Sequence, residues 1–285
     1  MKPPIFTTVM DKYFWLDGGS MFGVVPRVVW ERFHPADERH RIQIATRSLV
    51  VRHNGRVILC DMGIGNKLSA ETIEFYRVDM RNGDLYTRLF EIGIERGDVT
   101  DVFFTHLHFD HAGCATIFDD SGKVVPAFPN ATYYVQRAQY EWAINPVERD
   151  RDSYNPADFV PLYGAGQLKL LEGAEEVIKG VSVEPLGGHT PGMQLIRFDF
   201  AGASVVYTGD LFPFASHLRP SWIMAYDLNP LKTLEEKKRI MERAERERWI
   251  LVYEHDPDFT ATTVIKHPRK NSWQASEKIT LEELG

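Results

Sequence analysis

The chain has few cysteines, no excess of positive charge and no long apolar run. Its two cysteines, Cys60 and Cys114, suit a reducing compartment better than a disulfide-stabilised secreted fold, so we expect both thiols to be free. The 33 basic residues are outnumbered by 40 acidic ones, and the net charge of -7 would repel nucleic acid. No apolar stretch suits a membrane helix or a secretory leader, which predicts a soluble, unprocessed protein of the cytoplasm.

What the chain does have is enough apolar material for a sizeable core. Hydrophobic residues make up 44% of its 285 positions. No clear repeat and no low-complexity linker divides it. We therefore predict a single domain over residues 1–285, with residues 1–47 as an N-terminal arm. The expected partner is a small-molecule substrate, and a homodimer is left open.

One stretch, from Thr105 to Gly113, places four potential metal ligands within six residues. They are His106, His108, Asp110 and His111. The apolar run before them, 101–104, predicts a short buried strand, so the first two histidines leave its end on the same side of the backbone. Neutral imidazole and ionised carboxylate both suit zinc. A polar loop that is histidine-rich by chance is the alternative, with odds of about one in a thousand.

Three more candidate ligands follow predicted strands further along the chain. They are His189 after 181–186, Asp210 after 204–208 and His255 after 249–253. In open α/β sheets, sites are built at the carboxyl ends of strands, so these residues favour one common site. Asp61 ends the second strand of a hairpin predicted around Asn54 and Gly55. It is either a turn residue or a carboxylate that holds a ligand histidine.

The remaining elements are expected from periodicity and from proline and glycine. Helices are predicted at 84–95, 136–143 and 231–248, a strand at 131–135, and a long irregular loop at 145–166. Strands and helices thus alternate, which predicts an α/β protein.

Seven ligands are too many for one tetrahedral zinc ion and about right for two ions that share a carboxylate. A bridging Asp210 would hold the ions about 3.5 to 4 Å apart. Two cations lower the pKa of a bridging water toward about 7, and one of them can polarise a carbonyl or phosphoryl oxygen. The pattern predicts hydrolysis by a metal-bridging hydroxide. Cys114 is expected to pack beside the site, with a role as ligand as the alternative.

The ordered set, His-x-His-x-Asp-His followed by a single His, Asp and His, resembles the metallo-β-lactamase superfamily from Asp61 to His255. The resemblance implies an αβ/βα four-layer sandwich with the site at one edge of two facing sheets. It also implies how the ligands divide. One metal would take His106, His108 and His189, the other Asp110, His111 and His255, with Asp210 bridging. The implied cofactors are two divalent ions, zinc first, with iron, manganese or cobalt as alternatives.

Within the superfamily, the chain is most similar to the quorum-quenching N-acyl-homoserine lactone lactonases and methyl parathion hydrolase. True β-lactamases generally lack the bridging aspartate, the glutathione-binding region of glyoxalase II is not recognisable, and flavodiiron proteins carry a glutamate where this chain has His108. We therefore expect a zinc-dependent hydrolase that opens a lactone or cleaves a related ester. The alternatives are an aryl phosphotriester hydrolase, a di-iron redox or oxygen-binding protein, and a metal-stabilised binding module.

The chain differs from several of these lactonases at the position of a proton donor. Several lactonases place a tyrosine three residues after the bridging aspartate, where this chain has Pro213. His217 or Tyr207 could replace it, although strand alternation favours core packing for Tyr207. Asp110 and His217 are the predicted catalytic residues. An apolar substrate pocket is predicted from Met21, Phe22, Phe109, Phe212, Phe214 and Trp222, with simple packing of Met21 and Phe22 as the alternative.

Overall fold

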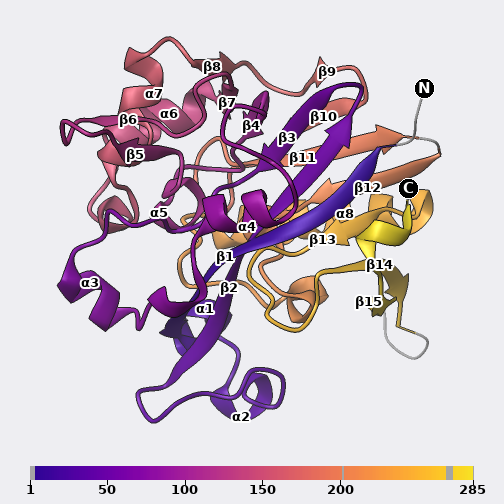
Figure 1. Cartoon of the computed structure of the whole chain (residues 1–285). Helices are drawn as coiled ribbons and strands as arrows, with labels where there is room; N and C mark the ends of the chain where they lie inside the picture. The colour runs from indigo at the N-terminus through magenta and orange to yellow at the C-terminus, as the bar shows by residue number, and fades with distance from the viewer. Residues whose placement is uncertain (1–3, 201, 268–271, 285) are drawn as a thin grey trace.

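Two β-sheets face each other, and helices cover the outer face of each, in the computed structural model of the chain (Figure 1). The structure describes residues 4–200, 202–267 and 272–284. Within them, one sheet has six strands in the order β1-β2-β3-β4-β7-β8. The other has seven, in the order β15-β14-β13-β12-β11-β10-β9, and β5 pairs with β6 alone. This arrangement confirms the predicted αβ/βα sandwich.

The bounds of the elements are as follows. The first sheet contains β1 (Ile5–Asp17), β2 (Arg41–His53), β3 (Arg56–Cys60), β4 (Asp101–Phe103), β7 (Thr132–Gln136) and β8 (Leu168–Leu171). The second contains β9 (Glu175–Ile178), β10 (Val181–Pro185), β11 (Gln194–Phe200), β12 (Ala203–Tyr207), β13 (Ile250–Val252), β14 (Ala261–Lys266) and β15 (Trp273–Lys278). The separate pair is β5 (Thr116–Phe118) and β6 (Val124–Pro126).

The helices are mostly short. The α-helices are α1 (Gly18–Phe22), α2 (Arg27–Trp30), α3 (Ala70–Phe75), α4 (Leu85–Glu91), α5 (Phe109–Ala112), α6 (Arg137–Ile144), α7 (Val160–Gly164) and α8 (Pro230–Glu247). The 3-10 helices are η1 (Met80–Asn82), η2 (Arg151–Ser153), η3 (Pro156–Asp158), η4 (Gly209–Leu211), η5 (Ala215–Leu218) and η6 (Leu281–Leu284). Among the described residues, no helix combines the length and apolar character needed to cross a membrane.

Alternate strand residues pack into different layers. In β3, Ile58 and Cys60 lie between the two sheets, whereas Leu59 packs toward α4, α6 and α7. In β12, Tyr207 lies between the sheets and Val206 packs against α8. This period of two follows from the pleat of a strand, and it gives each sheet two buried faces. The apolar runs that predicted these strands are therefore the core of the sandwich.

The hairpin predicted around Asn54 and Gly55 is confirmed. It joins β2 to β3, and its two central residues have φ values of 48° and 76°. Both lie in the left-handed region that a two-residue hairpin turn requires, and Asn-Gly reaches it with little strain.

The segment 1–47, expected to be an N-terminal arm, contributes strands to the first sheet. β1 and β2 are long antiparallel strands at the edge of the first sheet, with Ile5 opposite Arg52 and Asp17 opposite Arg41. A bulge between Met10 and Tyr13 shifts the register, and the two residues within it, Asp11 and Lys12, are buried as an ion pair. Such a bulge interrupts the alternation of apolar residues, so the sequence does not show the strand.

Two other expectations need correction. The segment 145–166 is not irregular, because η2, η3 and α7 lie within it. The helix predicted at 84–95 ends early as α4, since Gly93 has a φ of 72° and the chain turns there. The helix predicted at 231–248 corresponds closely to α8.

Candidate metal centre

Seven imidazole and carboxylate side chains meet at one edge of the two sheets. They are His106, His108, Asp110, His111, His189, Asp210 and His255, and each is at most 8% exposed. β3 and β4 are parallel, as are β12 and β13, so their carboxyl ends open toward the same edge. The turn between β10 and β11 brings His189 to the same place. The structure thus brings together all seven residues that the sequence singled out.

Asp210 lies between two groups of ligands. Its Oδ2 is 3.1 Å from Nε2 of His189 and 3.9 Å from Nε2 of His106. Its Oδ1 is 3.0 Å from Nε2 of His255 and 3.5 Å from Nε2 of His111. The donor atoms of each group could hold one ion. The groups are His106, His108, His189 and Asp210 on one side, and Asp110, His111 and His255 on the other.

Four of the histidines are held through their outer nitrogen. The Nδ1 atoms of His189 and His111 lie 2.8 Å from Asp227 and 3.0 Å from Asp61. Nδ1 of His255 lies 2.7 Å from the carbonyl of Ala45, which can only accept a hydrogen bond. Nδ1 of His106 lies 3.0 Å from Oγ1 of Thr105. These partners place the proton on Nδ1, so each Nε2 turns a lone pair toward the cluster.

The inward nitrogens are crowded in a way that suits cations. His108 presents Nδ1 instead of Nε2, at 2.9 Å from Nε2 of His106 and 3.3 Å from Nε2 of His189. Nε2 of His111 and Nε2 of His255 are 3.1 Å apart. Lone pairs at such distances repel one another unless a proton or a metal ion lies among them. The donor set therefore fits two divalent ions bound by nitrogen and oxygen.

The pKa values of the clustered histidines shift in both directions: those of His111, His189 and His255 are raised, and those of His106 and His108 are lowered. Burial and the neighbouring imidazoles hold the pKa values of His106 and His108 well below the usual range, which keeps both neutral, as a metal ligand must be. Burial alone would lower the pKa of His189, but Asp210 and Asp227 outweigh it and raise that pKa to about 10. Binding a cation at His189 would therefore displace a proton.

Asp61 is the residue that supports the centre most directly. It has a φ of 49°, a conformation that costs a non-glycine residue about 1 to 3 kcal/mol. Its carboxylate accepts from the backbone N–H of Thr105 at 2.7 Å and lies against His111. Glu254 also lies 2.8 Å from Nδ1 of His111, but burial raises the pKa of Glu254 to about 8. Asp61 thus fixes both the ring of His111 and the backbone of Thr105.

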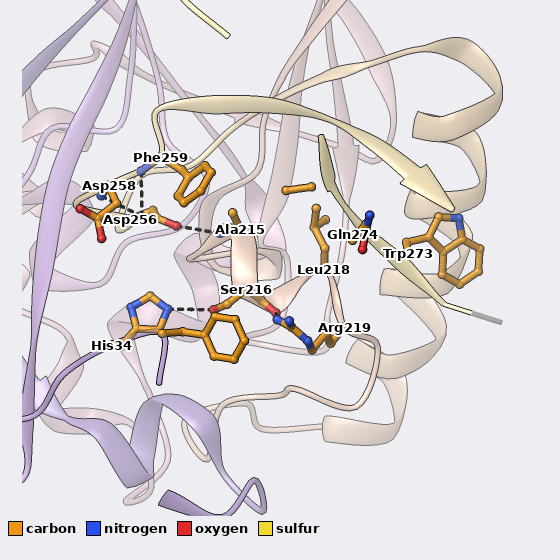
Figure 2. Close-up of a pocket in the computed structure, with 12 residues that line it drawn as sticks. His34, Ala215, Ser216, Leu218, Arg219, Asp256, Asp258, Phe259, Trp273 and Gln274 are labelled. Atoms are coloured by element: carbon orange, nitrogen blue, oxygen red, sulfur yellow. Dashed lines mark hydrogen bonds between the residues drawn. The ribbon is translucent and has the colours of Figure 1, made fainter. Parts of the chain in front are cut away.

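A cavity of about 320 Å³ behind η5 contains none of the seven ligands (Figure 2). Figure 2 shows His34 beside Ser216, with 2.9 Å between Nε2 and Oγ, and Asp256 accepting from the N–H of Ala215. Burial lowers the pKa of His34 to about 4, so its ring is neutral. These contacts hold η5 in place.

The cavity that does open onto the metal centre has a volume of about 310 Å³. Its floor includes His108, Asp110, His189, Asp210 and His255. Of the six residues predicted to form the substrate pocket, Met21 and Phe109 line it. Phe22, Phe212, Phe214 and Trp222 do not line it and are buried in the core beneath. Phe22, for example, stacks on Trp30 with 5.3 Å between ring centroids.

His217 lies outside this cavity, contrary to its predicted role as a proton donor. The side chain is 1% exposed, and its Nε2 donates to the carbonyl of Met21 at 2.9 Å. Its function is to hold Met21, and with it the cavity wall. Tyr207 is buried between the sheets and donates to the carbonyl of Arg47 at 2.6 Å, in keeping with the expected core packing.

Several lining residues could not be found from the sequence. Tyr76, Arg149 and Tyr226 all face the cavity, from three separate loops. No motif or spacing marks them, because their positions depend on how these loops pack over the ligand cluster. Cys60 and Cys114 are both buried and unpaired, and neither belongs to a ligand group among the described residues.

Comparison with known proteins agrees with this geometry. The N-acyl homoserine lactonase AiiA from Bacillus thuringiensis subsp. kurstaki is 30% identical over 172 residues, 59% of this chain and 60% of that protein. The lactonase AttM from Azorhizobium caulinodans is 27% identical over 186 residues, 59% of this chain and 62% of that protein. The alignments thus span less than two thirds of these relatives.

Solved structures extend the likeness to nearly the whole fold. A probable metal-dependent hydrolase from Staphylococcus aureus has a TM-score of 0.84 and 28% identity, over 98% of this chain and 100% of that one. The dizinc quorum-quenching lactonase AidC has a TM-score of 0.78 over 98% and 97%, but at 19% identity it shows the fold alone. The profile of the metallo-beta-lactamase superfamily matches residues 43–271. The protein is therefore a member of the metallo-beta-lactamase superfamily.

Proposed function

We propose that this chain is a dinuclear metal-dependent hydrolase that opens N-acyl-homoserine lactone-like rings or cleaves related esters, with zinc as its metal. The observation that carries the proposal is the position of Asp210, whose two oxygens face two separate groups of histidines on the floor of a cavity. The names of the relatives, N-acyl homoserine lactonases, support the lactone as substrate.

The metal ions and the side chains have different tasks. Two divalent cations held by the seven ligands would lower the pKa of water toward about 7 and polarise a carbonyl group. Water adds to the carbonyl carbon, the bond between that carbon and the ring oxygen breaks, and the products are a carboxylate, an alcohol and one released proton. Asp110 lines the cavity with Oδ2 3.7 Å from Nε2 of His255. A carboxylate oxygen of Asp110 would take the proton from water and pass it to the departing alkoxide.

Tyr226 offers the hydroxyl that Pro213 cannot supply. It lines the cavity, and burial raises its pKa to about 12 although a hydrogen bond with Ser20 opposes the shift. Its phenol therefore keeps its proton at neutral pH and can donate a hydrogen bond to a substrate oxygen. His217 and Tyr207 are buried, each donates to a backbone carbonyl, and neither lines the cavity, so they cannot.

The test is an activity screen of metal-loaded protein over lactones, aryl esters and aryl phosphotriesters, with metal analysis of the same sample. We expect lactone opening with kcat/KM above about 10⁴ M⁻¹s⁻¹ and two zinc ions per chain. Turnover of phosphotriesters without any lactone opening would replace the proposal by phosphotriester hydrolysis. Iron with a redox-dependent visible spectrum would replace it by di-iron chemistry.

A further inference from the structure

Three segments that form the rim of the cavity are joined at one residue, Ala225. Its backbone N–H donates to the carbonyl of Ser20 at 2.8 Å, which ties it to α1. Its carbonyl accepts from Nη2 of Arg149 at 2.6 Å, which ties it to the segment before η2. All three residues line the cavity. The rim is therefore closed by hydrogen bonds on both sides of a single residue.

The segment that contains Ala225, residues 222–228, is also fixed to the metal centre. Asp227 lies 2.8 Å from Nδ1 of His189, and the N–H of Leu228 donates to the carbonyl of His189 at 3.0 Å. Near α1, Gly23 leaves no room for a side chain, because a Cβ there would lie 2.4 Å from the carbonyl oxygen of Ile223. These contacts leave little freedom to move the segment away from α1 or from the ligands.

The contact with Arg149 is of a different kind. It comes from a long side chain on an exposed residue, and it reaches across to Ala225 from a stretch 76 residues away in the sequence. An exposed arginine that gains one hydrogen bond to a carbonyl loses side-chain entropy, so the contact is easily broken. The Arg149 side of the rim is therefore the side at which the cavity can be enlarged without disturbing the ligand cluster.

We propose that Arg149 determines substrate size by closing this rim, so that the enzyme prefers lactones and esters with a short acyl group. The proposal rests on the proposed function, since it concerns the acyl side of that substrate. The cavity volume of about 310 Å³ lies at the small end of ligand cavities, which span about 300 to 1,000 Å³. In this proposal, a long acyl chain leaves the cavity between Arg149 and Ala225, where a single hydrogen bond closes the rim.

The test compares R149A with wild type on homoserine lactones of increasing acyl length and on a matched series of aryl esters. We expect the ratio of kcat/KM for long against short acyl groups to rise about tenfold or more in R149A. R151A is the matched control, because Arg151 is exposed on the same stretch and its nearest partner is Glu148, at 3.5 Å. R151A should leave the ratio unchanged.

Two results would overturn the proposal. An equal loss of kcat/KM at every acyl length would mean that Arg149 binds the substrate itself, and an unchanged ratio would mean that the rim does not limit size.

A second measurement does not depend on turnover. Hydrogen exchange of the metal-loaded protein should be faster over residues 147–151 in R149A than in wild type or R151A, because this stretch loses its tie to Ala225, and equal exchange would refute the closure. If neither substrate series is hydrolysed, the proposed function fails while the exchange result still decides the closure.

Discussion

The carboxylate of Asp61 accepts a hydrogen bond from Nδ1 of His111, with 3.0 Å between Oδ2 and Nδ1, while the backbone of Asp61 has a φ of 49°. A buried carboxylate in a left-handed conformation directly beside a ligand histidine indicates that backbone strain is retained to orient the ligand.

We expect Asp61→Asn to weaken metal binding about 10- to 100-fold, as removal of an outer partner of a ligand histidine does. Asparagine tolerates the left-handed region, so the backbone should be kept while the charge is lost. Competition with a chromogenic chelator measures the affinity. The control is Asp101→Asn, a buried carboxylate at the start of β4. Similar losses in both variants would indicate general destabilisation instead.

Asp210→Asn should disrupt both ligand groups, since each carboxylate oxygen faces one of them. We expect fewer than two metal ions per chain and a fall in kcat/KM of more than about 100-fold. This fall is larger than the loss of about 10- to 100-fold that is typical when only an outer partner of a ligand is removed. Metal content after dialysis and steady-state kinetics measure the two effects. Asp227→Asn, which touches His189 alone among the ligands, should have the smaller effect. Full occupancy in Asp210→Asn would contradict a bridging role.

Tyr226→Phe should lower kcat about tenfold or more if its hydroxyl stabilises charge on the substrate oxygen. His217→Phe should change kcat less than about threefold and mainly raise KM, because His217 holds the carbonyl of Met21 and does not reach the cavity. The pH dependence of kcat for the His217 variant should match wild type. Loss of one limb of that profile would restore His217 as a proton donor.

Lys237 should make stability depend on pH. Its Nζ is buried and donates to the carbonyls of Arg219 and Trp222, and burial lowers its pKa to about 7. The unfolded chain, with a lysine pKa near about 10.4, binds more protons between these values. The free energy of unfolding should therefore rise with pH across this window, by up to about 1.4 kcal/mol per unit, and this contribution is lost as pH falls through about 7.

Urea unfolding at pH 7, 8 and 9 would measure this rise against Lys237→Met, in which it should vanish. Lys238→Met removes a neighbouring exposed lysine from α8 and should keep the slope of wild type. Identical slopes in wild type and Lys237→Met would show that the ammonium is not the cause.

Part of the fold could be predicted because the local pattern of apolar and turn residues indicates it. β3, β12 and β13 are short apolar runs between turn residues, and α8 carries a proline in its first turn. The sequence does not reveal β1, because its bulge buries an ion pair, Asp11 with Lys12, in the middle of the strand. A local pattern cannot reveal that these charges face each other inside the protein.

The candidate site divides in the same way. The sequence by itself determined the seven candidate ligands, because metal chemistry demands particular residue types and these stand directly after predicted strands. It did not determine the cavity wall. Phe22 and His217 look like pocket residues in the sequence, yet they stack on each other in the core at 5.0 Å, while Arg149 and Tyr226 face the cavity. Ligand identity follows from the chemistry of single side chains, whereas the shape of the cavity follows from the packing of distant loops, which only the tertiary structure decides.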